Sequence, residues 1–425
     1  MATTTQVIQH RRIYEVSPTR KLVMGIVEIL IAAVILFVFA KGMAPDTKTV
    51  FVMTPGGITQ GVMGNWTVPT QITLLILAGL TLIIGAYQLI KGFGRVTNSM
   101  VGLTGLFLIF AFITWQASGK SVNLAGMLSS AVLLSVPITL GAFSGVLCER
   151  AGVVNIAIEG MMLMAAMVGA LVGSLTHNAL LGLLGAVLSA VFLALVHGIL
   201  SIKYKINQII SGTVINIFSA GLTAFLSQKF LQTNQALNSP PMFSRIPIPL
   251  LADIPLLGPI LFNTNVFVYV MFALLIVIQV ALFSTRWGLR VRSVGEHPKA
   301  ADTLGINVFR TRYMAVMLGG AVAGIAGGFF TLGSIGRFDE GMTAGKGFIG
   351  LAAMIFGNWT PLGAMGGGLL FGFADAIGSK LSILGSTIPP QFMAMAPYLI
   401  TMIVLAGFIG KGQMPAADGE PYTKE

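Results

Sequence analysis

Long, uninterrupted apolar runs recur along most of the chain. Each is close to the roughly 20 residues that a helix needs to cross the hydrocarbon core of a bilayer. The runs are continuous and do not alternate with polar positions, which argues against the strands of a transmembrane barrel. The pattern therefore predicts an all-α, polytopic transmembrane helical bundle with about 11 spans. The predicted spans lie near residues 22–40, 70–90, 100–117, 125–147, 153–175, 179–202, 206–230, 265–285, 313–333, 361–379 and 393–410.

One further apolar stretch, 347–357, is too short to cross a bilayer alone. It ends at the turn-forming sequence GNWTP, which covers residues 357–361. We expect a half-helix here, or the first arm of a hairpin whose second arm is 361–379. The distribution of basic residues favours the hairpin. The alternation of basic segments between the two sides of the membrane closes only if 347–357 dips inward and 361–379 returns.

The composition agrees with a membrane protein. Hydrophobic residues make up 55% of the 425 positions and charged residues only 9%, whereas soluble domains carry about a quarter charged residues. This excludes an ordinary cytosolic enzyme, a disordered protein and a nucleic-acid binder, despite a net charge of +11. The single cysteine, Cys148, excludes a disulfide framework and a cysteine-rich metal site.

Most Lys and Arg residues lie in every second segment between the predicted spans. The positive-inside rule assigns those segments to the cytoplasm. The basic segment 286–312 then faces in, the proline-rich segment 231–264 faces out, and both termini are cytoplasmic. Residues 1–21 are polar and no cleavage site follows the first apolar run, so we expect 22–40 to be a retained anchor.

Polar residues inside predicted spans are candidates for a solute pathway, because they are costly there. Asn155 and Glu159 are four residues apart and would share one helix face. Asn207, Ser211 and Asn216 lie near a second polar stripe along 206–230. Such groups suit an uncharged polar solute, such as a sugar or nucleoside. The alternative is hydrogen bonding between helices, without contact to solute.

Two other carboxylates lie within spans. We expect Glu28 to reach the membrane interface and Asp375 to bond to a neighbouring backbone. His177 and His197 are not spaced for a metal, and neither HExxH nor a local Ser–His–Asp motif occurs. We therefore expect no catalytic residues, no metal site and no cofactor. The P-loop sequence is also absent, so any ATP hydrolysis must belong to a partner.

The inward segment 286–312 contains a predicted helix of about two turns. Pro298 suits a first turn, with Glu296 or His297 before it, and Gly305 is placed to end it. Its apolar positions favour a docking element for a soluble partner, and a helix lying on lipid headgroups is the alternative. The candidate docking residues are Gly295, Glu296, His297, Pro298, Lys299, Ala300, Ala301, Asp302 and Gly305.

Three stretches together resemble a known family. They are ERAGVVNIAIEGMM at 149–162, SIKYKINQIISGTVIN at 201–216 and GEHPKAAD at 295–302. The first resembles bacterial ABC-importer permeases of the branched-chain amino acid, ribose and nucleoside class. The other two are similar to its nucleoside or simple-sugar branch, and in particular to the second permease subunit. The third departs from the usual EAA pattern, because three residues separate Glu296 from Ala300.

The resemblance, which covers about 125–411, implies a bacterial plasma membrane protein with several partners. They are a second permease subunit, ABC ATPase subunits on the cytoplasmic side and an extracytoplasmic solute-binding lipoprotein. It implies that 295–306 enters a groove on the ATPase. The expected domains are a permease core at 121–411, an N-terminal extension with about three extra helices at 1–120 and a cytoplasmic tail at 412–425.

The resulting hypothesis is alternating access to a pathway for nucleosides or simple sugars, driven by a separate ATPase. A secondary transporter or channel is one alternative, in which Glu159 and Asp375 would couple ions. Import of branched-chain amino acids by the same class is another. An intramembrane enzyme is disfavoured, since no nucleophile and base are paired.

Overall fold

A computed structural model of the chain describes residues 18–383, 395 and 413–424. Within this part, ten helices are long and apolar enough to cross a membrane, which confirms the polytopic helical fold. They coincide with the first ten predicted spans; the predicted span 393–410 lies outside the described residues. The described residues form two compact units, one from 18–53 with 64–124 and the other from 54–63 with 125–383, 395 and 413–424.

The first unit consists of three long helices and a small sheet. Its helices are α1 (Pro18–Val34) with its continuation η1 (Ile35–Ala40), α2 (Thr70–Ile90), and η2 (Gly94–Val96) leading into α3 (Thr97–Gln116). In the sheet, β1 (Lys48–Val52) pairs antiparallel with β2 (Trp66–Pro69) and parallel with β3 (Ser121–Asn123). The ring of Phe51 stacks on Phe110 at 5.4 Å, which joins the sheet to α3.

Glu28 of α1 is fully buried within the first unit. Its Cβ would lie 3.1 Å from a Cβ built on Gly85 of α2, so the two helices approach closely beside it. The expectation that this carboxylate reaches the interface is therefore wrong. The absence of a side chain at Gly85 lets α2 cover it.

The second unit is the larger one. Its long helices are α4 (Leu124–Glu149), α5 (Ile158–Thr176), α6 (Ala179–Gly198), α7 (Gln208–Leu226), α8 (Val266–Ser284), α11 (Val308–Gly328) and α13 (Pro361–Ile383). Its shorter helices are α9 (Arg286–Glu296), α10 (Pro298–Thr303) and α12 (Lys346–Phe356). Irregular helical turns are η3 (Ile199–Lys203), η4 (Ser227–Leu231), η5 (Gln235–Asn238), η6 (Gly258–Phe262) and η7 (Phe329–Ile335). Two short strands, β4 (Arg245–Pro247) and β5 (Asn263–Asn265), pair antiparallel.

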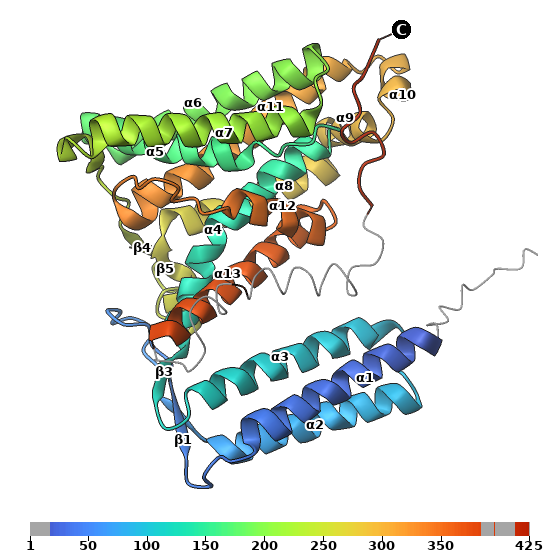
Figure 1. Cartoon of the computed structure of the whole chain (residues 1–425), viewed down its shortest axis with the longest axis vertical. Coiled ribbons are helices and arrows are strands. Elements are labelled where there is room, and N and C mark those ends of the chain that lie inside the picture. The colour runs from blue at the N-terminus through green and yellow to red at the C-terminus, as the bar shows by residue number, and fades with distance from the viewer. Residues whose placement is uncertain (1–17, 384–394, 396–412, 425) are drawn as a thin grey trace, which may run out of the picture. The chain divides into compact units, whose positions relative to one another are not determined.

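Helices α5, α6, α7 and α11 lie side by side in the second unit (Figure 1). Glycines permit the close approach. A Cβ built on Gly320 or Gly324 of α11 would lie within 2.6 Å of atoms of α6, and one on Gly327 only 2.2 Å from the carbonyl oxygen of Met162 on α5. Small residues serve this purpose in membranes, where close packing replaces the hydrophobic effect between helices.

The short apolar stretch forms the predicted hairpin. α12 ends at Phe356 and α13 begins at Pro361, after a turn in which Asn358 and Trp359 both have φ near +50°. The arms meet where Gly357 lies against Gly363, since a Cβ on Gly363 would be 2.3 Å from the Gly357 carbonyl oxygen. Asp375 of α13 forms an ion pair with Lys346 at the start of α12, instead of the expected backbone contact.

The segment 286–312 holds two helices where the sequence predicted one. α10 begins at Pro298 as expected, and Gly305 follows it with φ of +80°. The preceding α9 was not predicted; it is an amphipathic helix whose cap is Thr285, which accepts from the Gly288 N–H at 3.1 Å. We call α9 and α10 together the α9–α10 element.

Candidate functional site

Glu159 caps the half-helix α12 from the first turn of α5. Its carboxylate accepts hydrogen bonds from the Thr343 hydroxyl at 2.7 Å and from the N–H groups of Gly345 and Gly347 at 2.9 and 2.7 Å. Gly345 is the N-cap residue of α12. A negative charge at this position stabilises the free N–H groups and the positive end of the helix dipole. Glu159 thus joins α5 to the hairpin.

Asn155 precedes α5 and is not part of a helix. The predicted helix face shared with Glu159 is therefore wrong. Helix α4 ends at Glu149, Gly152 has φ of +78°, and helical structure resumes only at Ile158. The Asn155 side chain is fully buried, and its amide donates to the Cys148 sulfur at 3.4 Å.

Side chains of α6 and α7 satisfy the backbone of this irregular segment. The Gln208 side chain accepts from the Val154 N–H at 2.6 Å. Asn216 donates to the Ile156 carbonyl at 2.9 Å and accepts from the Gly160 N–H at 2.8 Å. Backbone outside regular helices is tolerated at membrane depth only where protein or water satisfies it. The polar stripe of α7 supplies these partners.

Ser211 of α7 also lies against this irregular segment, through His197 of α6. Its hydroxyl lies 3.0 Å from His197 Nδ1, and His197 Nε2 lies 3.0 Å from the Val154 carbonyl oxygen. We call His197, Gln208, Ser211 and Asn216, with the segment 154–160, the polar seam. The sequence argument chose neither His197 nor Gln208 as a pathway candidate. The spacing of Gln208 and Ser211 on one helix was a signal for Gln208, whereas the contact of His197 with Ser211 arises only from the packing of α6 on α7.

Asn207 has a different role from the rest of the stripe. Its side chain accepts from the N–H groups of Ile209 and Ile210 at 2.9 and 3.2 Å, which makes it the N-cap of α7. An Asn at this position typically contributes about 1 kcal/mol to a helix. The five predicted pathway residues are therefore one helix cap, one capping carboxylate of a neighbouring helix, and three polar groups in or against the segment 154–160, of which Asn155 and Ser211 are buried and Asn216 is half-buried.

The α9–α10 element has a buried side and an exposed side. Gly295 packs on the turn after α4, because a Cβ there would lie 2.3 Å from the Arg150 carbonyl oxygen. Ala301 is buried. Lys299 and Ala300 are exposed, and so is Leu304, at 81% of its surface. Leu289 of α9 is also largely exposed, so the exposed side of the element carries two large apolar side chains among its basic residues.

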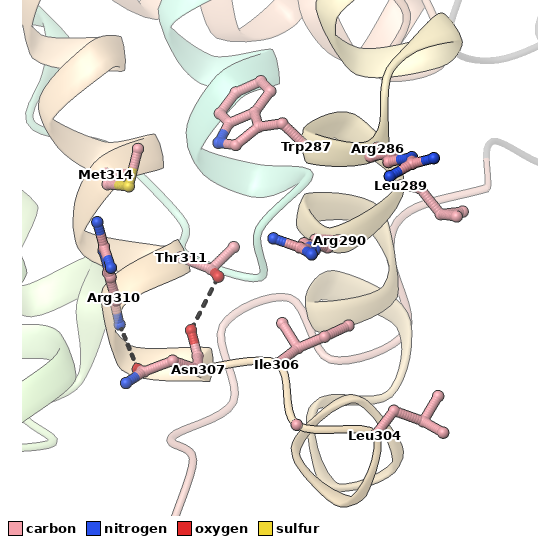
Figure 2. A pocket seen from close by; sticks show the side chains of 11 residues that line it. Arg286, Trp287, Leu289, Arg290, Leu304, Ile306, Asn307, Arg310, Thr311 and Met314 are labelled. Atoms are coloured by element: carbon pink, nitrogen blue, oxygen red, sulfur yellow. Dashed lines mark hydrogen bonds between the residues drawn. The ribbon is translucent and has the colours of Figure 1, made fainter.

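A pocket of about 690 Å³ lies between α9 and α11 (Figure 2). Arg290 extends from α9 toward Thr311 of α11 in this view, and Leu304 marks its lower edge. Within the part of the chain that the structure describes, Arg286, Arg290 and Arg310 have no acidic partner. The pocket is thus basic, with an apolar rim.

The described residues contain no group of three or more His, Cys, Asp or Glu side chains that could hold a metal ion. The polar side chains named above take part in hydrogen bonds to neighbouring backbone and side chains.

Comparison with known families decides the class. Residues 127–406 match the family described as branched-chain amino acid transport system / permease component. The chain belongs to this family. Membership places the permease in an ABC system in which a separate ATPase hydrolyses ATP and a second permease subunit takes part. It is a multi-pass membrane transport subunit and not an enzyme, and the secondary-transporter alternative is not favoured.

Several curated relatives match the permease over nearly their whole length. The guanosine ABC transporter permease protein NupQ of Bacillus subtilis is 40% identical over 69% of this chain and 95% of its own. The nucleoside ABC transporter permease protein NupC of Lactococcus lactis is 39% identical over 70% of this chain and 96% of its own. A putative glucose ABC transporter permease, TsgC13 of Haloferax volcanii, is 33% identical over 71% and 98%. No solved structure matches the chain.

Proposed function

We propose that this permease forms part of the pathway by which an ABC importer takes up nucleosides, with simple sugars as the second solute class. The observation that carries the proposal is the similarity to the guanosine and nucleoside permeases, at 40% and 39% identity over almost their full lengths. The glucose permease relative, at 33%, supports the sugar alternative.

In this proposal Asn155, Glu159, Ser211 and Asn216 shape the pathway by holding the irregular segment and the half-helix in place. Interrupted helices are where transporters place their solute sites, because freed backbone groups and half-helix ends point into the cavity. The side chains of Gln208, Ser211 and Asn216 in the seam are uncharged, which fits a polar, uncharged solute. Asn207 fixes the start of α7 and acts on the pathway through that helix.

We propose further that the α9–α10 element docks on the ATPase. Three features support it: the exposed apolar side chains Leu289 and Leu304, the unpaired arginines of the adjoining pocket, and the buried anchor Ala301. The element would lie in the cytoplasm, as would both termini, in a bacterial plasma membrane. An extracytoplasmic solute-binding lipoprotein would deliver the solute.

In this arrangement residues 121–411 form the permease core, 1–120 an N-terminal extension and 412–425 a segment on the cytoplasmic side. Alternating access then requires that nucleotide bound to the ATPase stabilise one packing of the core over another. The permease's own residues make no covalent bond.

The solute class is tested by reconstituting the permease with its sister permease, ATPase and binding protein in proteoliposomes. We expect ATP-dependent uptake of radiolabelled guanosine that excess unlabelled nucleoside suppresses and glucose does not. Uptake of glucose alone would replace the nucleoside with the sugar class. Uptake by the permease without an ATPase would contradict the proposal.

The docking role is tested with Leu304→Asp. Because this side chain is 81% exposed, the change leaves the fold intact but places a charge where the partner would bury an apolar group. We expect at least about a tenfold loss of ATPase affinity, since burying an unpaired charge costs more than 1.4 kcal/mol. The matched control is Leu250→Asp, at a leucine 85% exposed elsewhere in the same unit. Equal ATPase binding by both variants would refute the docking role.

A further inference from the structure

The described end of the chain, residues 413–424, crosses three parts of the second unit. The Gln413 N–H donates to the Asn358 side chain in the hairpin turn at 2.7 Å. The N–H groups of Ala416 and Ala417 donate to the Glu296 carboxylate and the Gly295 carbonyl at 3.2 and 2.9 Å. We call 413–424 the C-terminal strap. Figure 1 shows it in dark red beside α9 and α10.

Ionisable groups are buried where the strap meets α11. Arg312 of α11 is only 1% exposed, and its guanidinium donates to the Glu420 carbonyl at 2.9 Å. The Asp418 carboxyl is buried next to Arg312 and Glu149. A buried guanidinium is costly without such partners. The strap therefore completes the interior here, and a freely solvated tail is excluded for these residues.

The strap also carries an apolar anchor. Tyr422 is buried in a cluster with Val294 of α9, Ala301 of α10 and Val308 of α11. Its ring lies 5.4 Å from that of Phe309. Beyond it, Lys424 is 3.7 Å from Asp302 of α10, with an exposed side chain. The anchor thus touches both helices of the α9–α10 element and the start of α11.

The strap contributes much of what holds α10 in place. This helix has only six residues, and Ala301 is its one buried side chain. A helix of this length is not stable without packing partners. Tyr422 covers Ala301, while the contacts at Gly295 and Glu296 hold the preceding end of α9.

We propose that the C-terminal strap is a positioning device that ties the α9–α10 element to the α12–α13 turn and to α11, so that a displacement of α10 by the ATPase moves these parts together. The inference rests on the docking role proposed above. Gln413 and Asn358 form the link at the hairpin, and Ala417 with Gly295 forms the link at α9. Tyr422 is the residue that fixes the strap to α10.

The test compares Tyr422→Ala with Lys424→Ala in the assembled transporter. Hydrogen exchange of α10 amides reports whether the element is held, and solute moved per ATP hydrolysed reports coupling. We expect Tyr422→Ala to raise α10 exchange at least about tenfold, because it removes a buried aromatic ring, and to lower uptake per ATP. Lys424→Ala should change neither, since an exposed ion pair contributes little. Tyr422→Phe, which keeps the ring in this cluster, should recover most of the loss in both values.

A deletion of 413–425 provides the second variant. Unchanged α10 exchange in this deletion would overturn the inference, as would faster exchange with undiminished uptake per ATP. The proposed docking role fails separately, through Leu304→Asp binding the ATPase normally. In that case faster α10 exchange in Tyr422→Ala would still show that the strap holds the element, but the strap's part in coupling would be overturned.

Discussion

At the scale of single residues, polar side chains in the second unit replace water for backbone that leaves regular helices. Glu159 binds N–H groups at the start of α12, and Asn216 binds both a carbonyl and an N–H of the segment 154–160. Each unsatisfied backbone group in hydrocarbon costs several kcal/mol. These residues therefore make interrupted helices possible inside a membrane.

Glu159→Ala is expected to destabilise the protein by about 2–4 kcal/mol, because it leaves three donors without their charged acceptor. Thermal unfolding in detergent measures the effect. Glu340→Ala is the matched control, since this carboxylate is exposed and accepts only from the side chains of Gln228 and Gln232. A similar loss in both variants would contradict the capping role.

Burial raises the pKa of Asp418 to about 7, against a partial lowering by a hydrogen bond with Glu149 and by the charge of Arg312. Glu149 faces it from α4 and Arg312 from α11. In the bound strap the Asp418 carboxyl therefore keeps its proton up to about pH 7. In the released strap it loses that proton near pH 4. The strap therefore binds to the second unit most strongly below about pH 4. Its binding weakens between about pH 4 and pH 7 and is constant above that. Exchange of strap amides, corrected for intrinsic rates, measures this.

Asp418→Asn provides the comparison for the pH profile. The amide does not titrate, so we expect strap protection in this variant to vary less between pH 5 and pH 8. Protection that increases with pH in the wild-type protein would have the wrong sign and would contradict the prediction.

At the scale of elements, glycines set how closely helices meet. The α12–α13 hairpin depends on Gly363 facing Gly357, whereas Gly366, one turn further along α13, has no neighbour within 4 Å of a built Cβ. The same helix thus offers a crowded and an open glycine.

Gly363→Ala is expected to cost about 1–3 kcal/mol, because its methyl group must displace backbone. Gly366→Ala should cost nothing, since alanine favours a helix and the space is open. Thermal unfolding of the two variants, measured side by side, checks the difference. Equal stability would mean that the turn opens without penalty.

The α9–α10 element shows how element prediction depends on strong local signals. Pro298 and Gly305 bracket α10 and were sufficient to predict it. α9 has a start signal in its N-cap Thr285, but it carries four charged residues among eleven, so its amphipathic pattern was read as a basic loop. Burial of Val291 and Val294 against the core stabilises it as a helix.

At the scale of the whole molecule, the family match begins at residue 127, and the first unit lies outside it. The relatives align over 95% or more of their own lengths with about 70% of this chain. The three helices of the first unit thus lie outside the family match, which supports the proposal that 1–120 is an N-terminal extension. Their fold is compact in itself, with its own core around Phe39 and Leu74.

The orientation in the membrane is testable with single cysteines. The positive-inside rule predicts that Leu250→Cys is labelled from outside intact cells by an impermeant maleimide, and that Leu304→Cys is labelled only after lysis. Both side chains are highly exposed. The native Cys148 is buried, so the wild-type protein should show little background. The reverse pattern would invert the topology.

The sequence alone determined the ten described spans, the hairpin of α12 and α13 and the helix at Pro298, because these follow from local hydropathy and from the backbone preferences of Pro and Gly. Only the tertiary structure decided the partners of the polar residues. Glu159 meets Thr343 across 184 positions, and Arg312 meets Glu420 across 108. No local pattern encodes such pairs, since they arise when separate helices pack. For the same reason the sequence left 413–424 as a tail, although packing on α9, α10 and α11 makes it part of the core.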